Sequence, residues 1–329
     1  MAVYTPVSAD DLAQFLAGYD VGEAISFKGI AEGVENSNFL LETTGGPKGG
    51  GGRAPGRFIL TLYEKRVAEA DLPWFLALMA HLAGKGLPVP GPVADRQGRS
   101  LQQLNGRPAC LIEFLSGVSV TEPTPAAAHE VGVALGRMHA ATADFSAIRA
   151  NSLGHAAWTP LADRCKGRLG EIDPALPALV AAGLAAAADW PAGLPQATIH
   201  ADLFPDNVLL LDGRVTGLID FYFACTDQRA YDVAVTHAAW CFSGDGRTFM
   251  ADRATALLAG YGEVIRLQAD EIAALPRLAA GAALRFTLTR AYDWLNTPAD
   301  ALVTRKDPMA FARRLAWYLA ATPDAMHGR

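Results

Sequence analysis

Short apolar segments dominate the first third of the chain, whereas in the remainder apolar residues recur every three to four positions. Short apolar runs bounded by turn residues are typical of strands, and the longer spacing is typical of helices. The expected strands cover Ala24–Ile30, Asn38–Thr43, Arg57–Tyr63 and Pro108–Leu115. The expected later helices cover Pro125–Ala140, Leu161–Gly170, Leu176–Asp189, Tyr231–Phe242, Arg247–Gly260, Ala269–Asn296 with interruptions, and Met309–Ala321.

Two helices are expected among the early strands. One covers Ser8–Gly18, for which Ser8 is a suitable N-cap, and the other covers Ala70–Ala83. The glycine-rich run at 45–52 indicates a flexible insertion in a hairpin. We therefore predict an α+β protein with a small antiparallel-sheet lobe over residues 1–115 and a larger, mostly helical lobe over residues 116–329.

The composition indicates a folded protein with an extensive core. Of the 329 residues 51% are hydrophobic, and the formal net charge is −6, so the basic face of a nucleic-acid binder is not expected. Neither a signal peptide nor a membrane-spanning segment is recognisable. Cys110, Cys165, Cys225 and Cys241 are spaced too irregularly for a zinc site and indicate reduced thiols. We expect a cytoplasmic protein without nucleic-acid or membrane partners; the sequence does not indicate its oligomeric state.

The chemistry is concentrated in a segment with the pattern H-x-D-x-x-x-x-N, formed by His200, Asp202 and Asn207. An apolar strand, an Asp212-Gly213 turn and a return strand follow and lead to Asp220. Phosphoryl transfer needs a base for the acceptor hydroxyl and hard oxygen ligands for magnesium. We predict that Asp202 is the base, that Asn207 and Asp220 are the magnesium ligands, and that the hairpin brings these two ligands together.

Two other interpretations of this segment remain open. In one, His200 and Asp202 only hydrogen-bond a loop and Asp220 caps a helix. In the other, the segment belongs to a metal hydrolase, which requires further ligands at matched spacing, whereas the remaining histidines are scattered. For His200 itself we expect a structural role, holding the loop by hydrogen bonds.

Six segments resemble the aminoglycoside phosphotransferase and choline kinase-like superfamily, and within it the homoserine kinases of the second type. The segments are Gly33–Phe39, Phe58–Glu64, Ile112–Gly117, His200–Leu209, Ile219–Cys225 and Tyr231–Val235. The resemblance extends over nearly the whole chain. It implies a protein-kinase-like bilobal fold, the cofactors ATP and Mg²⁺, and direct in-line transfer of the γ-phosphoryl group to the hydroxyl of L-homoserine.

The resemblance also implies positions for the nucleotide. Asn36, Ser37 and Asn38 would lie in the turn between the first two strands, where kinase-like folds cover the ATP phosphates. Glu113 and Leu115 would lie at the hinge, whose backbone contacts adenine. These five residues are therefore candidates for cofactor binding.

Other implied positions include one departure from the family pattern. Asp232 falls where the family has an acid that supports the catalytic loop. Thr61 occupies the position where kinase-like folds usually have a phosphate-binding lysine. Lys65 or Lys28 are possible substitutes, and Glu69 is a candidate partner acid on the following helix.

The acceptor site must bind a zwitterion, which requires a cation or amide for the carboxylate and an anion or carbonyl for the ammonium. Arg290 and Asp227 are our candidates. Arg285 and Arg290 are five residues apart, about 140° around a helix, so we do not expect them to share one face. Alternative functions are a kinase of the same fold for an amino-alcohol, a sugar or an aminoglycoside, or a nucleotide-binding protein without catalytic activity.

Overall fold

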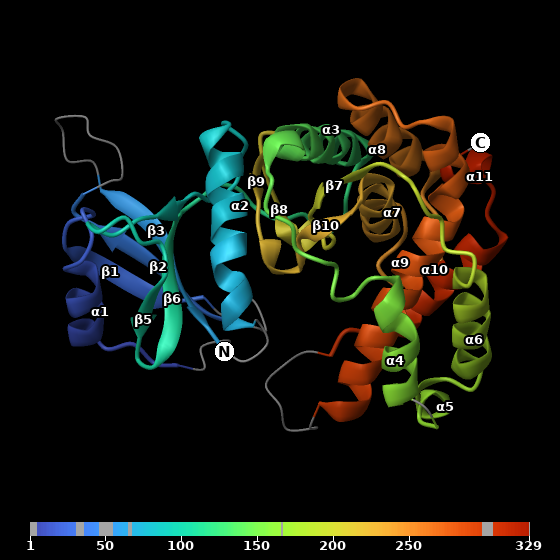
Figure 1. Cartoon of the computed structure of the whole chain (residues 1–329), viewed down its shortest axis with the longest axis horizontal. Helices are drawn as coiled ribbons and strands as arrows, with labels where there is room; N and C mark the ends of the chain where they lie inside the picture. Colours follow the sequence, from blue (N-terminus) through green and yellow to red (C-terminus); the bar gives the residue numbers. More distant parts are fainter. Residues whose placement is uncertain are drawn as a thin grey trace. The chain divides into compact units, whose positions relative to one another are not determined.

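The computed structural model describes residues 5–30, 36–45, 55–64, 68–165, 167–297 and 305–328. It divides into two compact units, Met1–Ser116 and Gly117–Arg329 (Figure 1). Lys65 and most of the glycine-rich run, residues 46–52, lie outside the described residues. No helix in the described ranges combines the length and the apolar character that crossing a membrane requires.

The first unit is built on an antiparallel sheet with the strand order β1-β2-β3-β6-β4, and β5 pairs with β6 (Figure 1). The long pairing of β2 with β3 runs from Asn36 opposite Tyr63 to Thr43 opposite Gly56. The strands are β1 (Ala24–Gly29), β2 (Asn36–Thr43), β3 (Gly56–Tyr63), β4 (Pro92–Val93), β5 (Gln102–Leu104) and β6 (Arg107–Glu113). The expected antiparallel sheet is confirmed.

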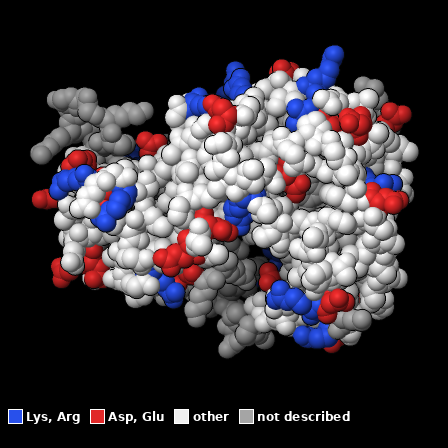
Figure 2. All heavy atoms as spheres, viewed as in Figure 1, with Lys and Arg blue, Asp and Glu red and all other residues white. Residues whose placement is uncertain are grey.

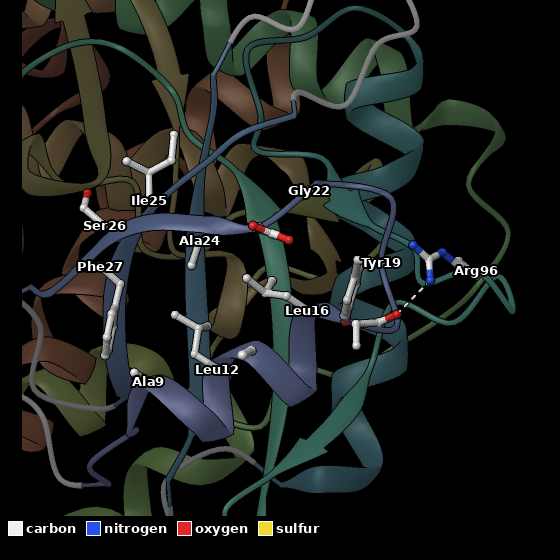
Figure 3. A pocket seen from close by; sticks show the side chains of 13 residues that line it. Ala9, Leu12, Leu16, Tyr19, Gly22, Ala24, Ile25, Ser26, Phe27 and Arg96 are labelled. Atoms are coloured by element: carbon white, nitrogen blue, oxygen red, sulfur yellow. Dashed lines mark hydrogen bonds between the residues drawn. The ribbon is translucent and has the colours of Figure 1, made fainter.

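Two helices accompany this sheet, α1 (Ala9–Leu16) and α2 (Leu72–Gly84). Ser8 caps α1 as expected, because its hydroxyl accepts from the backbone N–H of Asp11 and the Asp11 carboxylate accepts from the N–H of Ser8. The apolar side of α1 packs on the sheet and joins the core around Leu60. An open groove between α1 and β1 is lined largely by apolar side chains (Figure 3). It contains none of the residues to which we assign chemistry.

The second unit is mostly helical, and α9 lies at its centre, packed against α4, α6, α7 and α10. Two short two-stranded sheets complete it, one of β7 and β10 and one of β8 and β9. The strands are β7 (Gln196–Ile199), β8 (Val208–Leu211), β9 (Arg214–Leu218) and β10 (Cys225–Gln228). The helices are α3 (Pro125–Ala141), α4 (His155–Cys165), α5 (Leu169–Ile172), α6 (Leu176–Ala187), α7 (Arg229–Trp240), α8 (Ala251–Val264), α9 (Ala269–Asn296), α10 (Met309–Ala320) and α11 (Pro323–Met326).

Several expected helix bounds shift by a few residues, for example α8 begins at Ala251 rather than Arg247. Two larger differences arise because proline is tolerated inside a packed helix. Helix α4 begins at His155 rather than Leu161 and continues through Pro160, anchored by the buried Trp158. Helix α9 is continuous through Pro276, although we expected interruptions. Packing of apolar residues on both sides of each proline outweighs the lost backbone hydrogen bond.

Charged side chains of both signs are interspersed on the visible face of the molecule (Figure 2). On this face the described residues form no extended basic area, in agreement with the negative net charge. All four cysteines are buried free thiols. Burial raises the pKa of the Cys110 and Cys225 thiols to about 12, so both stay protonated at neutral pH.

Helices α3 and α8 approach so closely that glycine is required at their contact. A Cβ atom added at Gly132 would overlap the carbonyl oxygen of Leu257, and one added at Gly260 would overlap the carbonyl oxygen of His129. Backbone therefore lies against backbone at this crossing. No side chain fits between the two helices without separating them.

We expect Gly132→Ala to lower the free energy of unfolding by about 3 kcal/mol, because the helices must move apart. The matched control is Gly262→Ala in α8, where an added Cβ meets nothing within 4 Å. That variant should gain about 0.5–1 kcal/mol, the helix propensity of alanine over glycine. Urea unfolding followed by circular dichroism measures both, and equal stabilities of the two variants would contradict the proposed close contact.

Helix α7 contains a buried histidine that stays neutral in the folded protein. Nε2–H of His237 donates to the carbonyl of Met326 (3.1 Å), and Nδ1 lies 2.6 Å from the Tyr318 hydroxyl. Burial lowers the pKa of His237 to about 4. In the unfolded chain this imidazole is therefore protonated below about pH 6.5, whereas in the folded chain it is protonated only below about pH 4.

This difference predicts that stability falls as the pH decreases through this window. The unfolded state binds more protons than the folded state between the two pKa values, so unfolding becomes easier by about 3 kcal/mol in total. The variant His237→Gln can still donate to Met326 but does not titrate, so its stability should depend less on pH. Urea unfolding at pH 7.5, 6 and 5 makes the comparison, and parallel pH profiles would refute the assignment.

Candidate active site

The catalytic-loop candidate, His200–Asn207, connects β7 to the hairpin of β8 and β9 in the second unit. Asp212 and Gly213 form the turn of this hairpin, with φ values of 50° and 75°. Two successive positive φ values fit the type I′ turn expected from an Asp-Gly pair. At the open end, the Ile219 N–H donates to the Asn207 carbonyl (3.0 Å). The hairpin thus returns the chain to Asn207 one residue before Asp220.

The Asn207 side chain is oriented by Asp202. Its Nδ2 donates to the carbonyl oxygen of Asp202 (2.8 Å) and to the carboxylate Oδ2 of the same residue (3.2 Å). Both partners only accept hydrogen bonds, so the amide nitrogen must face them and the amide oxygen faces the other way. Asn207 can therefore present an oxygen ligand while holding the Asp202 carboxylate in place.

Asp220 has a backbone conformation that is uncommon for any residue except glycine. Its φ of 65° and ψ of 60° lie in the left-handed region. The residue is exposed, directly after β9 and at the start of the short 3-10 helix Phe221–Phe223. Backbone strain of this kind is concentrated at functional sites. The conformation ends the strand sharply and leaves the carboxylate accessible to a cation.

Asp232, on α7, binds the backbone at the start of the loop. Its two carboxylate oxygens accept from the backbone N–H groups of His200 and Ala201, each at 2.7 Å. Nε2 of His139 lies 3.0 Å from Oδ2. Burial opposes ionisation of this fully buried carboxyl, but the hydrogen bond and the charge of His139 outweigh it and hold the pKa of Asp232 below its usual range. The loop therefore rests on a buried carboxylate.

Ala201 shows how tightly the loop is fixed. Its φ of 61° is unfavourable for alanine. Asp232 binds its N–H, and Nη1 of Arg285 donates to its carbonyl oxygen (2.5 Å). Arg285 is only 1% exposed and belongs to α9. Two charged groups on two helices thus clamp one peptide unit and maintain the strained backbone immediately before Asp202.

The hydrogen bonds of His200 fit a neutral imidazole that links the loop to the end of β9. Because the Ile219 carbonyl can only accept, the bond of 3.0 Å between them requires a proton on Nε2. Nδ1 then accepts the N–H of Asp202 (3.3 Å). Burial lowers the pKa of His200, which favours this neutral form. Farther along the loop, the indole Nε1–H of Trp240 donates to the carbonyl of Leu203 (2.9 Å).

The two acceptor-site candidates lie in different surroundings of the second unit. Asp227, on β10, accepts from Nδ2 of Asn151 (2.7 Å) and from the N–H of Gln228 (2.7 Å). Arg290, on α9, stands over the rings of Phe204 and Phe311, at 5.9 and 4.4 Å from their centroids. Arg285 and Arg290 both contact the loop despite their angular separation. Arg285 hydrogen-bonds the Ala201 carbonyl, and Arg290 stands over the Phe204 ring.

Three nucleotide candidates in the first unit are not in a turn as expected. Asn36, Ser37 and Asn38 are the first residues of β2, because pairing with β3 extends to the end of that strand. Ser37 is fully buried, and its hydroxyl donates to Glu64 (2.8 Å). The side-chain oxygen of Asn38 accepts from the hydroxyl of Thr61 (2.8 Å). The side chains of Ser37 and Asn38 thus connect β2 to β3.

The remaining residues of the nucleotide prediction are distributed over the sheet. Thr61, at the position of the usual lysine, is 2% exposed. Lys28 is exposed on β1, at the edge of the sheet. Glu69 begins a 3-10 turn before α2. Glu113 ends β6 with its N–H bound to the Gly91 carbonyl (2.9 Å), and Leu115 follows two residues later.

Comparison with known proteins agrees with the motif. The phosphotransferase enzyme family matches residues 26–267. Homoserine kinase of Methylobacterium radiotolerans is 52% identical over 100% of this chain and 99% of its own. Homoserine kinase of Bradyrhizobium diazoefficiens is 53% identical over 100% of this chain and 98% of its own. The resemblance seen in the sequence is confirmed.

Solved structures agree in fold at much lower identity. An amicoumacin kinase in complex with AMP-PNP, Ca²⁺ and Ami superposes with a TM-score of 0.69 at 15% identity, covering 96% of this chain and 95% of its own. A spectinomycin phosphotransferase in complex with ADP and spectinomycin gives 0.67 at 12% identity, covering 95% of each chain. The predicted kinase-like fold class is confirmed. The chain belongs to the phosphotransferase enzyme family, in the branch that contains these homoserine kinases.

Proposed function

We propose that this chain catalyses the ATP-dependent phosphorylation of the L-homoserine hydroxyl, giving O-phospho-L-homoserine and ADP in threonine biosynthesis. The observation that supports this most strongly is the loop in which Asn207 holds the carboxylate of Asp202, within a chain about half identical over its full length to homoserine kinases. The buried thiols fit a cytoplasmic setting.

In this proposal Asp202 acts as the base. Its carboxylate orients the acceptor hydroxyl and takes up the hydroxyl proton as the oxygen bonds to the γ-phosphorus. The bond from that phosphorus to the bridging oxygen of ADP breaks in the same displacement, and ADP departs. The clamp on Ala201 and the bonds from Asn207 keep the carboxylate in one position, so little reorganisation is needed during transfer.

The residues fit a magnesium ion. Asn207 presents an amide oxygen because its nitrogen is engaged, and Asp220 supplies an exposed carboxylate. Both are hard oxygen donors, and a small protein ligand set suits a cation that keeps several waters. When bound with ATP, the ion neutralises charge on the phosphates. We assign nucleotide binding to the first unit. Backbone groups at Glu113 and Leu115 would contact adenine, and the start of β2, from Asn36, would contact the phosphates.

The test is ADP release by the purified chain with magnesium and ATP, offered L-homoserine, choline, methylthioribose or an aminoglycoside. We expect turnover with L-homoserine far above the others, a phosphorus NMR signal of a phosphomonoester, and loss of activity on chelation of the metal. Absence of turnover with L-homoserine would refute the proposed substrate. Preference for another alcohol would keep the reaction class and change the acceptor.

A further inference from the structure

Arg290 lies beside the loop that carries the proposed base. Phe204 follows Asp202 by two residues, and its N–H donates to the Asp202 carbonyl (2.8 Å). The guanidinium of Arg290 stands 5.9 Å from the Phe204 ring centroid and 4.4 Å from that of Phe311 on α10. Phe204 and Phe311 are themselves in contact, with centroids 5.7 Å apart. These rings form an apolar support that holds the cation at the side of the loop.

Among the described residues, no carboxylate forms an ion pair or a hydrogen bond with the Arg290 guanidinium. Within the described ranges its guanidinium has one hydrogen bond, a long one of 3.4 Å to the backbone carbonyl of Asp307. Two neighbouring cations do have carboxylate partners. Lys306 pairs with Asp206 (3.1 Å), and Arg313 lies 3.8 Å from the Asp307 carboxylate. Arg290 is therefore a half-buried cation, and the described residues engage one of its five N–H donors.

Arg290 is partly desolvated and lies close to a second cation. Burial lowers the pKa of Arg290 to about 10, against the opposing influence of Asp202, Asp206 and Asp307, so the group stays charged at neutral pH. Arg314 stands over the same Phe311 ring at 4.3 Å and adds a second positive charge. An anion that binds Arg290 would offset both its desolvation and the repulsion from Arg314.

The other arginines near the loop are not suited to this task. Arg285 is 1% exposed and is committed to the Ala201 carbonyl. Arg314 is 4% exposed, and its Nη2 donates to the Ser243 carbonyl (3.0 Å). Arg290 is the partly exposed member of this set. Its contact with the loop runs through the Phe204 ring, two residues after Asp202.

We propose that Arg290 binds the α-carboxylate of L-homoserine and so makes the site select an amino-acid alcohol over a simple amino alcohol. This inference rests on the proposed function. The carboxylate is the anionic group that separates homoserine from 3-aminopropan-1-ol, which has the same hydroxyl and amine. A planar guanidinium matches a carboxylate with two parallel hydrogen bonds, which an ammonium cannot do.

The experiment compares Arg290→Met, Arg290→Lys and the wild-type chain on L-homoserine and on 3-aminopropan-1-ol. Methionine retains an apolar stem against Phe204 and Phe311, so the packing is preserved. We expect Arg290→Met to raise KM for L-homoserine about 10- to 100-fold with kcat little changed, and to leave KM for 3-aminopropan-1-ol unchanged. Arg290→Lys should recover only part of the loss, because the charge remains and the fork geometry does not.

Lys306→Met is the matched control. It removes the same charge near the same ring, 5.8 Å from the Phe204 centroid, but from a cation already paired with Asp206. Its KM for L-homoserine should change less than about threefold, as for other exposed ion pairs. Thermal unfolding of each variant verifies that the fold is retained.

Three results would overturn the inference. An equal rise in KM for both substrates would indicate a structural role for Arg290. A fall in kcat with both substrates would indicate contact with the transferring phosphoryl group. An effect of Lys306→Met as large as that of Arg290→Met would indicate general electrostatic attraction. If the wild-type chain itself does not phosphorylate L-homoserine, the proposed function fails instead, so the two failures are distinguishable.

Discussion

Replacing Asp202 with alanine is expected to lower kcat for homoserine phosphorylation about 10²- to 10⁴-fold, the usual contribution of a general base. The loop should survive the change. Asn207 loses its bond of 3.2 Å to the carboxylate but keeps the shorter one to the backbone carbonyl of residue 202. His200 and Ala201 stay bound to Asp232. The loss should therefore appear in kcat, with KM for ATP little altered.

The control for this measurement is Asp206→Ala in the same loop. Asp206 is exposed, and its ion pair with Lys306 is formed by two side chains that are each 59% exposed. An exposed pair of this kind contributes little, so kcat should stay within about threefold of the wild-type value. Steady-state kinetics of the two variants decide the matter. Near wild-type turnover by Asp202→Ala would exclude Asp202 as the base.

Replacing Asp232 with alanine should produce the largest loss of stability, about 3–5 kcal/mol. The variant leaves two backbone N–H groups, those of His200 and Ala201, and the ring of His139 without their buried acceptor. Activity should fall with stability, because the peptide before Asp202 loses one side of its clamp. Thr236→Ala on the same helix is the control. Its buried hydroxyl donates only to the Asp232 backbone carbonyl, so its loss should be about 1 kcal/mol.

The pH dependence gives a second measurement on the same residue. The folded pKa of Asp232 is held below that of the unfolded chain, so its stabilisation is complete above the unfolded value of about 4. It is lost as the pH falls through the folded pKa. The difference in stability between the wild-type chain and Asp232→Ala should therefore be constant near neutral pH and shrink in acid. A difference that grows as the pH falls would contradict this assignment.

Local spacing was sufficient to predict the hairpin that follows the candidate catalytic loop. The loop, the Asp-Gly turn and the return strand all lie between Asp202 and Asp220, so their geometry follows from adjacent residues. The resemblance to known kinases added a role for Asp232, although that residue is 31 positions from Ala201. The early sheet and most helices were likewise predictable from periodicity and capping.

The supports of the loop were not predictable in the same way. His139 binds Asp232 across 93 residues and Arg285 binds Ala201 across 84 residues, and nothing near either residue in the sequence indicates its partner. Arg285 could be read as a surface cation, whereas it is buried beneath Ala201. The positions of Asn36 and Ser37 were misjudged for a related reason, since strand length depends on pairing with β3 and not on composition alone.

The close contact of α3 and α8 has a consequence for how this sequence can change over time. Tyr261 follows Gly260 on α8, and its hydroxyl lies 2.9 Å from Nδ1 of His139 on α3, the histidine that binds Asp232. Any residue that separates the two helices also stretches this connection to the loop. Selection for turnover alone would then preserve Gly132 and Gly260, even in a protein stable enough to tolerate the loss of folding free energy.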